Sequence, residues 1–148
     1  MDVIDYHKIE VSDETKQLRD EIIDEVMPQL VQEYGFSHDQ RTFRKAYISL
    51  AKQLGYVLTA LSHDLSGKTI LDLGCGHNPS EEEKRKFPND RIFEPWLCRA
   101  LHYLNIRAIG IDLGNLDGEL FEHYQYAKQQ IHSSFHPTGP DFHLWMRL

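Results

Sequence analysis

The stretch from residue 69 to residue 80 constrains the fold more than any other part of the chain. It reads TILDLGCGHNPS, so a short apolar run ends in an acid and continues directly into Gly-Cys-Gly. A short apolar run bounded by turn residues is typical of a strand that is buried on both faces, as in a parallel sheet. A second run of this kind, RAIGIDLG at residues 107–114, again ends in an acid followed by glycine. The sequence therefore predicts two buried, parallel strands.

The segment between these strands predicts a helical crossover. EPWLCRALHYLN, residues 94–105, has Pro95 where a helix would begin and leucines recurring on one helical face. A strand, a helix and a strand in this order form a βαβ unit, whose crossover is right-handed in nearly all proteins. The polar residues 80–93 precede this helix and predict an inserted loop that forms a lid or a wall of a binding site.

The N-terminal part predicts two helices. From Ser12 to Tyr34 apolar residues recur at three- and four-residue steps, which predicts a helix with Ser12 as its N-cap. Pro28 predicts a kink or a break within this helix. A second helix is expected to begin at Ser37, where SHDQ has the form of a capping box.

Length and charge limit the classes of protein to which the chain can belong. The 148 residues favour one domain, in which we expect a helical lead-in at residues 1–66 and a sheet-bearing part at residues 67–148. The net charge of −7 argues against an extended nucleic-acid-binding track. There is no apolar run of the roughly 20 residues that span a bilayer, no signal-peptide pattern and no framework of disulfide-forming cysteines. These features predict a cytoplasmic protein without membrane partners.

The ends of the two predicted strands carry residues that indicate a ligand. In a βαβ unit the ligand lies beyond the carboxyl ends of the strands. Gly74 and Gly76 let the backbone approach it closely, and Asp112 can accept hydrogen bonds from two ribose hydroxyls. A dinucleotide fingerprint would carry a third glycine, but Pro79 and three glutamates follow here, and Asp72 would repel a pyrophosphate. A ligand with an ammonium group and a ribose, such as S-adenosylmethionine, therefore fits better than NAD.

Two short motifs resemble those of a known enzyme family. ILDLGCG resembles the first motif of the class I S-adenosylmethionine-dependent methyltransferases, and AIGIDL resembles their second-strand motif. The resemblance implies a Rossmann-like parallel sheet preceded by two helices, with S-adenosylmethionine or S-adenosylhomocysteine as the ligand. It implies that Asp72 contacts the methionine amino end, that Asp112 holds the ribose and that Leu113 lines the adenine. The turn beneath the cofactor would be formed by Gly74, Cys75 and Gly76. No residue is assigned a catalytic role, and no methyl acceptor is indicated.

The chain departs from this family most clearly after Gly114. The family's sheet continues through a third and a fourth strand, whereas here we predict a helix at Asp117–Ser133 followed by an irregular segment at residues 133–148. The alternative for the first of these segments is that LFEHYQY, residues 120–126, forms a third strand. We therefore expect a partial sheet, truncated after its second strand, in which the acceptor-binding half is missing.

A sheet truncated in this way would leave one edge of the Thr69–Leu73 strand open. An open apolar edge is a template for pairing, so we expect either a homodimer formed through it or an edge that the exposed aromatic residues of the C-terminal segment cover. This gives a second interpretation of the function, in which the chain is a non-catalytic module whose main property is dimerisation. A nicotinamide or other nucleotide site is a third interpretation, which Asp72 and Pro79 disfavour.

Several of these residues also have a purely structural explanation. Cys75 lies where a nucleophile could be held, but no base is near it in the sequence, so we expect a small turn residue. His132 and His136 have the spacing of two ligands on one helical face but lack the intervening glutamate of a zinc-binding helix, and we predict no metal site. The alternative for Asp72 and Asp112 is that they cap turns at the ends of their strands.

Overall fold

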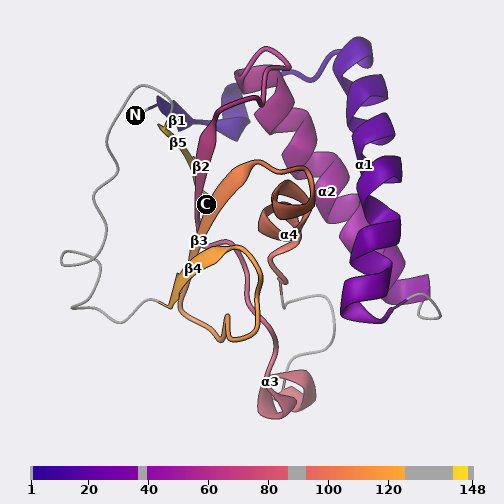
Figure 1. Ribbon diagram of the computed structural model, residues 1–148, viewed down its shortest axis with the longest axis vertical. Coiled ribbons are helices and arrows are strands. Elements are labelled where there is room, and N and C mark those ends of the chain that lie inside the picture. Colours follow the sequence, from indigo (N-terminus) through magenta and orange to yellow (C-terminus); the bar gives the residue numbers. More distant parts are fainter. Residues whose placement is uncertain (1, 37–39, 87–92, 126–141, 147–148) are drawn as a thin grey trace.

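A parallel sheet forms the centre of the structure. The computed structural model describes residues 2–36, 40–86, 93–125 and 142–146, and in these residues the sheet has five strands. They are β1 (Asp2–Ile4), β2 (Thr69–Leu73), β3 (Arg107–Asp112), β4 (Glu122–Gln125) and β5 (Phe142–Met146). Their spatial order is β1-β5-β2-β3-β4, and each neighbouring pair is parallel (Figure 1). The chain is therefore an α/β protein with a parallel sheet, as predicted.

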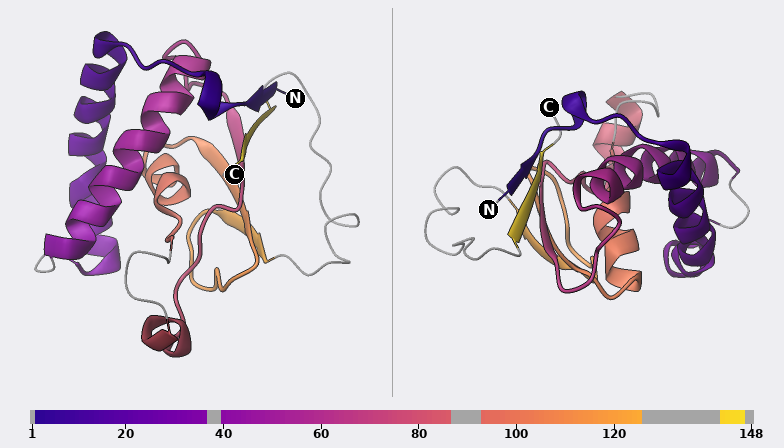
Figure 2. Two further views of the ribbon diagram at one scale, coloured as in Figure 1. Left: turned by 180° about the vertical axis from the view of Figure 1, so that it is seen from behind. Right: turned by 90° about the horizontal axis from the view of Figure 1, so that it is seen from above.

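The longer helices lie against one face of this sheet. Helices α1 (Asp13–Tyr34) and α2 (Gln40–Ala60) pack together, and α4 (Trp96–Tyr103) lies between them and β3 (Figure 2). The short elements are the 3-10 helix η1 (Tyr6–Lys8) and α3 (Glu81–Lys86). Because α4 connects β2 to β3, the predicted helical crossover is confirmed.

Helix α1 confirms the predicted N-cap and corrects the expectation at Pro28. The Oγ atom of Ser12 accepts a hydrogen bond from the N–H of Thr15 at 3.1 Å, which satisfies a donor that the first helical turn leaves free. The helix continues through Pro28 to Tyr34, so the predicted break is wrong, whereas the alternative of a kink stays a prediction. Buried side chains on both sides of the proline hold the helix in the core: Ile23, Val26, Met27 and Leu30. This packing outweighs the backbone hydrogen bond that a proline cannot form.

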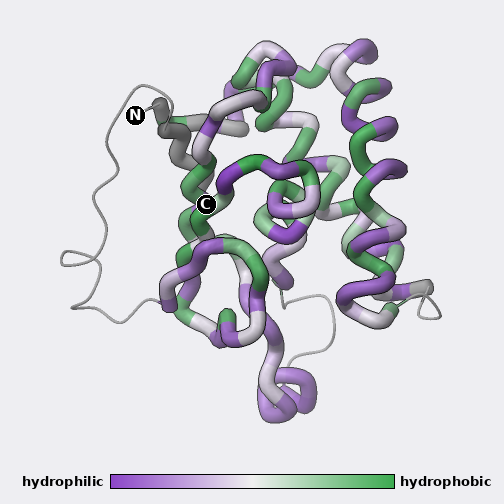
Figure 3. Tube along the Cα trace, in the orientation of Figure 1, coloured by the Kyte–Doolittle hydropathy of each residue, from purple (hydrophilic) through white to green (hydrophobic). Residues whose placement is uncertain are grey.

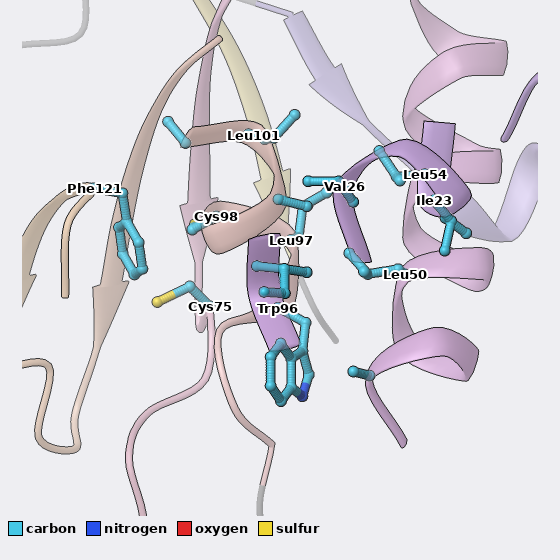
Figure 4. Packing of buried hydrophobic residues seen from close by; sticks show 14 of the residues in the cluster. Ile23, Val26, Leu50, Leu54, Cys75, Trp96, Leu97, Cys98, Leu101 and Phe121 are labelled. Carbon is cyan, nitrogen blue, oxygen red and sulfur yellow. The ribbon is translucent and has the colours of Figure 1, made fainter. Parts of the chain in front are cut away.

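The hydrophobic core fills the space between the sheet, α4 and the α1–α2 pair (Figure 4). From α2 the fully buried side chains are Ala46, Leu50, Leu54, Val57 and Leu58. From α4 they include Leu97, Cys98, Ala100 and Leu101. The second predicted helix is thus confirmed from Gln40 onward, and its predicted start at Ser37 lies outside the described residues.

The register of β2 and β3 sets the positions of the predicted site residues. Leu73 lies opposite Ile111, so the two strands end at the same edge of the sheet. Asp72 lies opposite Gly110, and Asp112 follows two residues later on the same face. The bend after β2 and the acid at the end of β3 are therefore neighbours, as the sequence predicted.

The prediction of a helix at Asp117–Ser133 is wrong for the residues that are described. Glu122 to Gln125 form β4 and pair with β3, which confirms the alternative of a third strand. The helical spacing of apolar residues is a weak preference, and pairing with the neighbouring strand overrides it. Residues 126–133 of the predicted helix lie outside the described part of the chain.

The predicted irregular C-terminal segment and the predicted open edge are also corrected. Within that segment, residues 142–146 form β5, and this strand pairs with β2 along its whole length. The sheet therefore does not end after its second strand, and the edge of β2 on which the dimer prediction depended is occupied. The alternative, in which the C-terminal segment covers that edge, is confirmed. β5 also pairs with β1, so the predicted helical lead-in at residues 1–66 contributes a strand to the same sheet. Dimerisation by any other route remains a prediction.

The distribution of polar residues separates α3 from the rest of the fold. Figure 3 shows hydrophilic residues along the whole of α3, whereas α1 and α2 alternate between hydrophilic and hydrophobic positions. α3 projects beyond the end of β2, and none of its residues is buried (Figure 1). Among the described residues, no helix combines the length and the apolar character that crossing a membrane requires.

Candidate functional site

The glycine bend after β2 is tied directly to the end of β3. Gly74 and Gly76 have φ angles of 72° and 98°, in the left-handed region that glycine adopts without strain. The N–H groups of Gly74 and Cys75 both donate to the carbonyl oxygen of Ile111, at 2.8 and 3.1 Å. The bend is therefore held across the two strand ends by backbone hydrogen bonds.

The Asp112 side chain accepts hydrogen bonds from several groups at the carboxyl ends of β2 and β3. Its Oδ2 atom accepts a hydrogen bond from the N–H of Gly76 at 2.9 Å, and its Oδ1 atom accepts one from the N–H of Gly114 at 2.9 Å. The same Oδ1 lies 3.0 Å from Nδ1 of His77. The Asp112 side chain is only 13% exposed. The glycine bend and the acid at the end of β3, which the sequence predicted to be neighbours, are thus in direct contact.

The segment that precedes α4 covers one side of the bend. The N–H of His77 donates to the carbonyl oxygen of Phe93 at 2.8 Å. A Cβ atom at Gly76 would lie 2.5 Å from that same oxygen, so only glycine fits there. At Gly74, in contrast, an added Cβ would meet no atom of the described residues within 4 Å. The bend is therefore packed at Gly76 and open at Gly74.

The remaining predicted site residues lie at different depths. Asp72 is fully buried, with its Oδ2 3.6 Å from the Sγ of Cys98 in α4. Leu113, which directly follows Asp112 in the sequence, is 71% exposed. Cys75 is fully buried and its Sγ donates to the carbonyl oxygen of Gly76 at 3.1 Å, as suits a small turn residue. The structure thus brings Gly74, Gly76 and Asp112 together, with Leu113 beside them and Asp72 beneath α4.

His77 is a member of this site that the sequence analysis missed. Its Nε2 atom lies 2.7 Å from Oε2 of Glu83 in α3, while its Nδ1 contacts Asp112. Partial burial lowers the pKa of His77, but the hydrogen bond to Glu83 and the charge of Asp112 outweigh burial and raise the pKa above 6.5. The hydrogen bond from His77 in turn lowers the pKa of Glu83. The imidazole ring thus connects α3 to the end of β3.

Arg99 forms a second polar cluster beneath the same edge. The Arg99 and Glu119 side chains are 0% and 1% exposed, and Nη2 of Arg99 lies 2.6 Å from Oε1 of Glu119. Nε of Arg99 also donates to both oxygens of Glu119, at 3.0 and 3.2 Å. Two further acceptors are Glu94, 3.2 Å from Nη1, and Asn78, 2.8 Å from Nη2. The guanidinium therefore links α4, the loop after β2 and the β3–β4 connection.

Aromatic side chains complete the surroundings of Arg99. Its guanidinium lies over the ring of Tyr34, 4.0 Å from the centroid, and over the ring of Trp96, 4.5 Å from the centroid. The hydroxyl of Tyr34 donates to Oε2 of Glu119 at 2.9 Å. Burial and the negative charge of Glu119 raise the pKa of Tyr34, so that it stays a donor. An arginine within a helix that is otherwise mostly apolar is a signal in the sequence for a buried partner.

The other features of the described residues are weaker candidates. A shallow hollow of about 350 Å³ lies between the amino ends of β3 and β4, lined in part by Arg107, Ala108 and Glu122. It is at the opposite end of the strands from the glycine bend. In the part of the chain that the structure describes, no three acids, histidines or cysteines are grouped so that they could hold a metal ion. His132 and His136 lie outside that part.

Comparisons with known proteins identify no relative of this chain. No protein-family model matches the chain, and no curated protein and no solved structure matches it.

Proposed function

We propose that the carboxyl ends of β2 and β3 bind S-adenosylmethionine and that the chain is a methyltransferase-type cofactor-binding protein. The observation that carries this proposal is the contact between the Gly76 N–H and the Asp112 carboxylate at 2.9 Å. It joins a side-chain-free bend and a strand-end acid at neighbouring ends of two parallel strands. The resemblance of ILDLGCG and AIGIDL to the first two motifs of class I methyltransferases depends on the same residues.

The strand order supports a Rossmann-like arrangement. From β2 the chain adds β3 and β4 on one side, and β5 then pairs with the other side of β2. The direction of strand addition thus reverses beside β2. In open α/β sheets, ligands bind outside the carboxyl ends of the strands at such a reversal. The bend at Gly74–Gly76 follows β2 directly.

The residues at this edge fit a nucleoside. In the described part of the chain Gly74 faces open space, so a ligand can approach its backbone closely. The Oδ2 atom of Asp112 accepts one described hydrogen bond and has a lone pair for a ribose hydroxyl. The exposed Leu113 offers an apolar surface for a base. A role for the buried Asp72 toward the methionine amino end remains a prediction.

The chain's own residues would act mainly by binding and orienting. S-adenosylmethionine supplies a sulfonium methyl group that an acceptor attacks in line. Asp112 and the glycine bend would fix the nucleoside, which holds the methyl group in one place and lowers the entropic part of the barrier. Cys75 is buried inside the turn, and we give it no role as a nucleophile.

Replacing Asp112 with alanine is expected to weaken binding of S-adenosylhomocysteine by about tenfold or more. The reason is that a hydrogen bond to a charged group contributes roughly 1.5–3 kcal/mol, and every 1.4 kcal/mol is about a tenfold change in affinity. Calorimetric titration with S-adenosylmethionine, S-adenosylhomocysteine and NAD measures it. Asp117→Ala is the matched control. Asp117 is an exposed acid on the same β3–β4 connection, and its replacement removes the same charge.

The outcomes of this titration separate the interpretations. Saturable binding of the two sulfur nucleosides, weakened in Asp112→Ala and unchanged in Asp117→Ala, supports the proposal. Binding of NAD alone would favour a dinucleotide site. No binding of any of the three by the folded wild-type protein would contradict the proposal.

A further inference from the structure

His77 lies between two carboxylates that come from different elements. Nδ1 is 3.0 Å from Oδ1 of Asp112 at the end of β3, and Nε2 is 2.7 Å from Oε2 of Glu83 in α3. An ionised carboxylate only accepts hydrogen bonds, so both ring nitrogens must donate to satisfy both contacts. A ring that donates from both nitrogens is an imidazolium. The arrangement is therefore a carboxylate–imidazolium–carboxylate bridge.

The surroundings of the ring hold this bridge in one geometry. A Cβ at Gly114 would lie 2.0 Å from Cγ of the His77 ring, so the imidazole rests directly on the glycine backbone. Glu83 is fixed by a reciprocal capping box, in which its N–H donates to Oγ of Ser80 at 3.1 Å and its Oε1 accepts from the Ser80 N–H at 3.2 Å. The His77 side chain is 22% exposed, so solvent protons reach the ring.

The bridge occupies a hydrogen-bond acceptor position of Asp112 that the hydroxyls of a ribose would need. An ionised carboxylate offers about four lone-pair positions. Oδ1 of Asp112 accepts from the Gly114 N–H and from His77, and Oδ2 accepts from the Gly76 N–H. Among the described residues no other donor contacts this carboxylate, so one position remains, whereas two vicinal ribose hydroxyls need two. The second position becomes available when His77 leaves, because the two backbone donors are fixed by the fold.

The charged groups that face His77 in the described residues are Asp112 from β3 and Glu83 from α3. The segment before α4 contributes only the backbone oxygen of Phe93, and the β3–β4 connection contributes the backbone of Gly114. Both facing groups favour the imidazolium, in agreement with the raised pKa of His77. The folded state therefore binds the proton more tightly than the unfolded state does. The bridge is fully formed below about pH 6.5, the ordinary pKa of histidine, and is lost as the pH rises through the raised value.

We propose that His77 is a pH-sensitive latch, which ties α3 to the end of β3 and competes with the ribose of the ligand for Asp112. The competition with a ligand rests on the proposed function, but the latch itself does not. It is a property of the ligand-free chain and is tested there first.

The ligand-free test follows the His77 ring by NMR as the pH is raised. In wild-type protein the ring is expected to titrate above 6.5, and the amide signals of Glu83 and Lys84 are expected to shift with the same midpoint. Glu83→Gln keeps the capping box, since glutamine also serves there, but removes the charge that faces the ring. It is expected to lower the His77 midpoint. Glu82→Gln is the matched control, because Glu82 lies in the same helix and pairs with Lys86.

The ligand test measures the Kd of S-adenosylhomocysteine from about pH 6 to about pH 9. Wild-type affinity is expected to rise about tenfold or more over this range, because the ribose gains one further hydrogen bond to the charged Asp112 carboxylate when His77 leaves. His77→Ala and His77→Gln are expected to bind more tightly than wild type at the low end and to lose most of the rise. Titration of the ligand itself is common to all three proteins and cancels in the comparison.

Each outcome decides one of the two claims. A His77 midpoint at or below 6.5, or one that Glu83→Gln leaves unchanged, overturns the latch. Weaker binding in both His77 variants at every pH overturns the competition and makes His77 part of the binding surface. If no protein binds the nucleoside while the His77 midpoint still depends on Glu83, the proposed function fails and the latch stands.

Discussion

Replacing Arg99 with methionine is expected to lower the free energy of unfolding by about 3–5 kcal/mol, the cost of leaving a buried charge without its partner. The charge left behind is that of Glu119, whose side chain is 1% exposed. Burial lowers the pKa of Arg99, but its hydrogen bonds and charge interactions with Glu119 outweigh this and raise the pKa. The Arg99 guanidinium is therefore charged at neutral pH. Urea unfolding followed by circular dichroism measures the loss.

A matched arginine elsewhere in the chain serves as the control. Arg107 forms an ion pair with Glu122 at 2.9 Å, but these side chains are 60% and 36% exposed. Arg107→Met is expected to cost at most about 1 kcal/mol, as is usual for an exposed pair. Equal losses in the two variants would show that the Arg99 cluster does not hold the loop after β2 against α4. The double variant Arg99→Met with Glu119→Leu is expected to recover part of the loss, because it removes the uncompensated charge.

Replacing Gly76 with alanine is expected to lower the free energy of unfolding by about 2–5 kcal/mol. Two costs add. A positive φ angle costs a residue with a side chain about 1–2 kcal/mol, and forcing extra atoms into a packed site costs about 1–3 kcal/mol more. The new Cβ would lie 2.5 Å from the carbonyl oxygen of Phe93, and a backbone atom cannot move aside as a flexible side chain can. Thermal or urea unfolding measures the loss.

Gly74→Ala separates these two costs. Gly74 lies in the same bend with a φ of 72°, but its Cβ position is open, so only the backbone cost of about 1–2 kcal/mol is expected. A larger loss at Gly76 than at Gly74 would support the close packing of the bend against the segment before α4. Equal losses in the two variants would contradict that packing and leave both sides of the bend open.

The parts of the fold that the sequence predicted are those with a local pattern. β2, β3 and α4 each carry a run of apolar residues bounded by turn signals, and α1 carries a capping serine before a periodic apolar face. Their boundaries agree closely with the structure. The predicted break at Pro28 failed because the packing of a long helix outweighed a local preference.

The strands β4 and β5 depended on partners that are distant in the sequence. β4 is EHYQ, a short run without an apolar pattern, and it becomes a strand by pairing with β3. β5 pairs with β2, which lies near the middle of the chain, and with β1, which lies near its beginning. A local pattern of residues does not record such pairings, so the predicted open edge of β2 was an error of topology.

The candidate site likewise contains contacts that the sequence could predict and contacts that it could not. Parallel strands end at one edge, so the contact between the glycine bend and Asp112 could be predicted. The contact of His77 with Asp112 joins residues 35 positions apart, and it depends on how the bend turns after Gly76. Arg99 and Glu119 are 20 residues apart and meet only because the β3–β4 connection folds under α4. Such contacts follow from the packed structure and not from motif spacing.

The most direct measurement of the central claim is an NMR titration of the isotope-labelled protein with S-adenosylhomocysteine. If the carboxyl ends of β2 and β3 bind the nucleoside, the amide signals of Gly74, Gly76, Leu113 and Gly114 shift first and most. The amides of Arg107, Ala108 and Glu122, around the hollow at the opposite end of the strands, stay in place. Shifts confined to that hollow, or no shifts at all in the folded protein, would contradict the account.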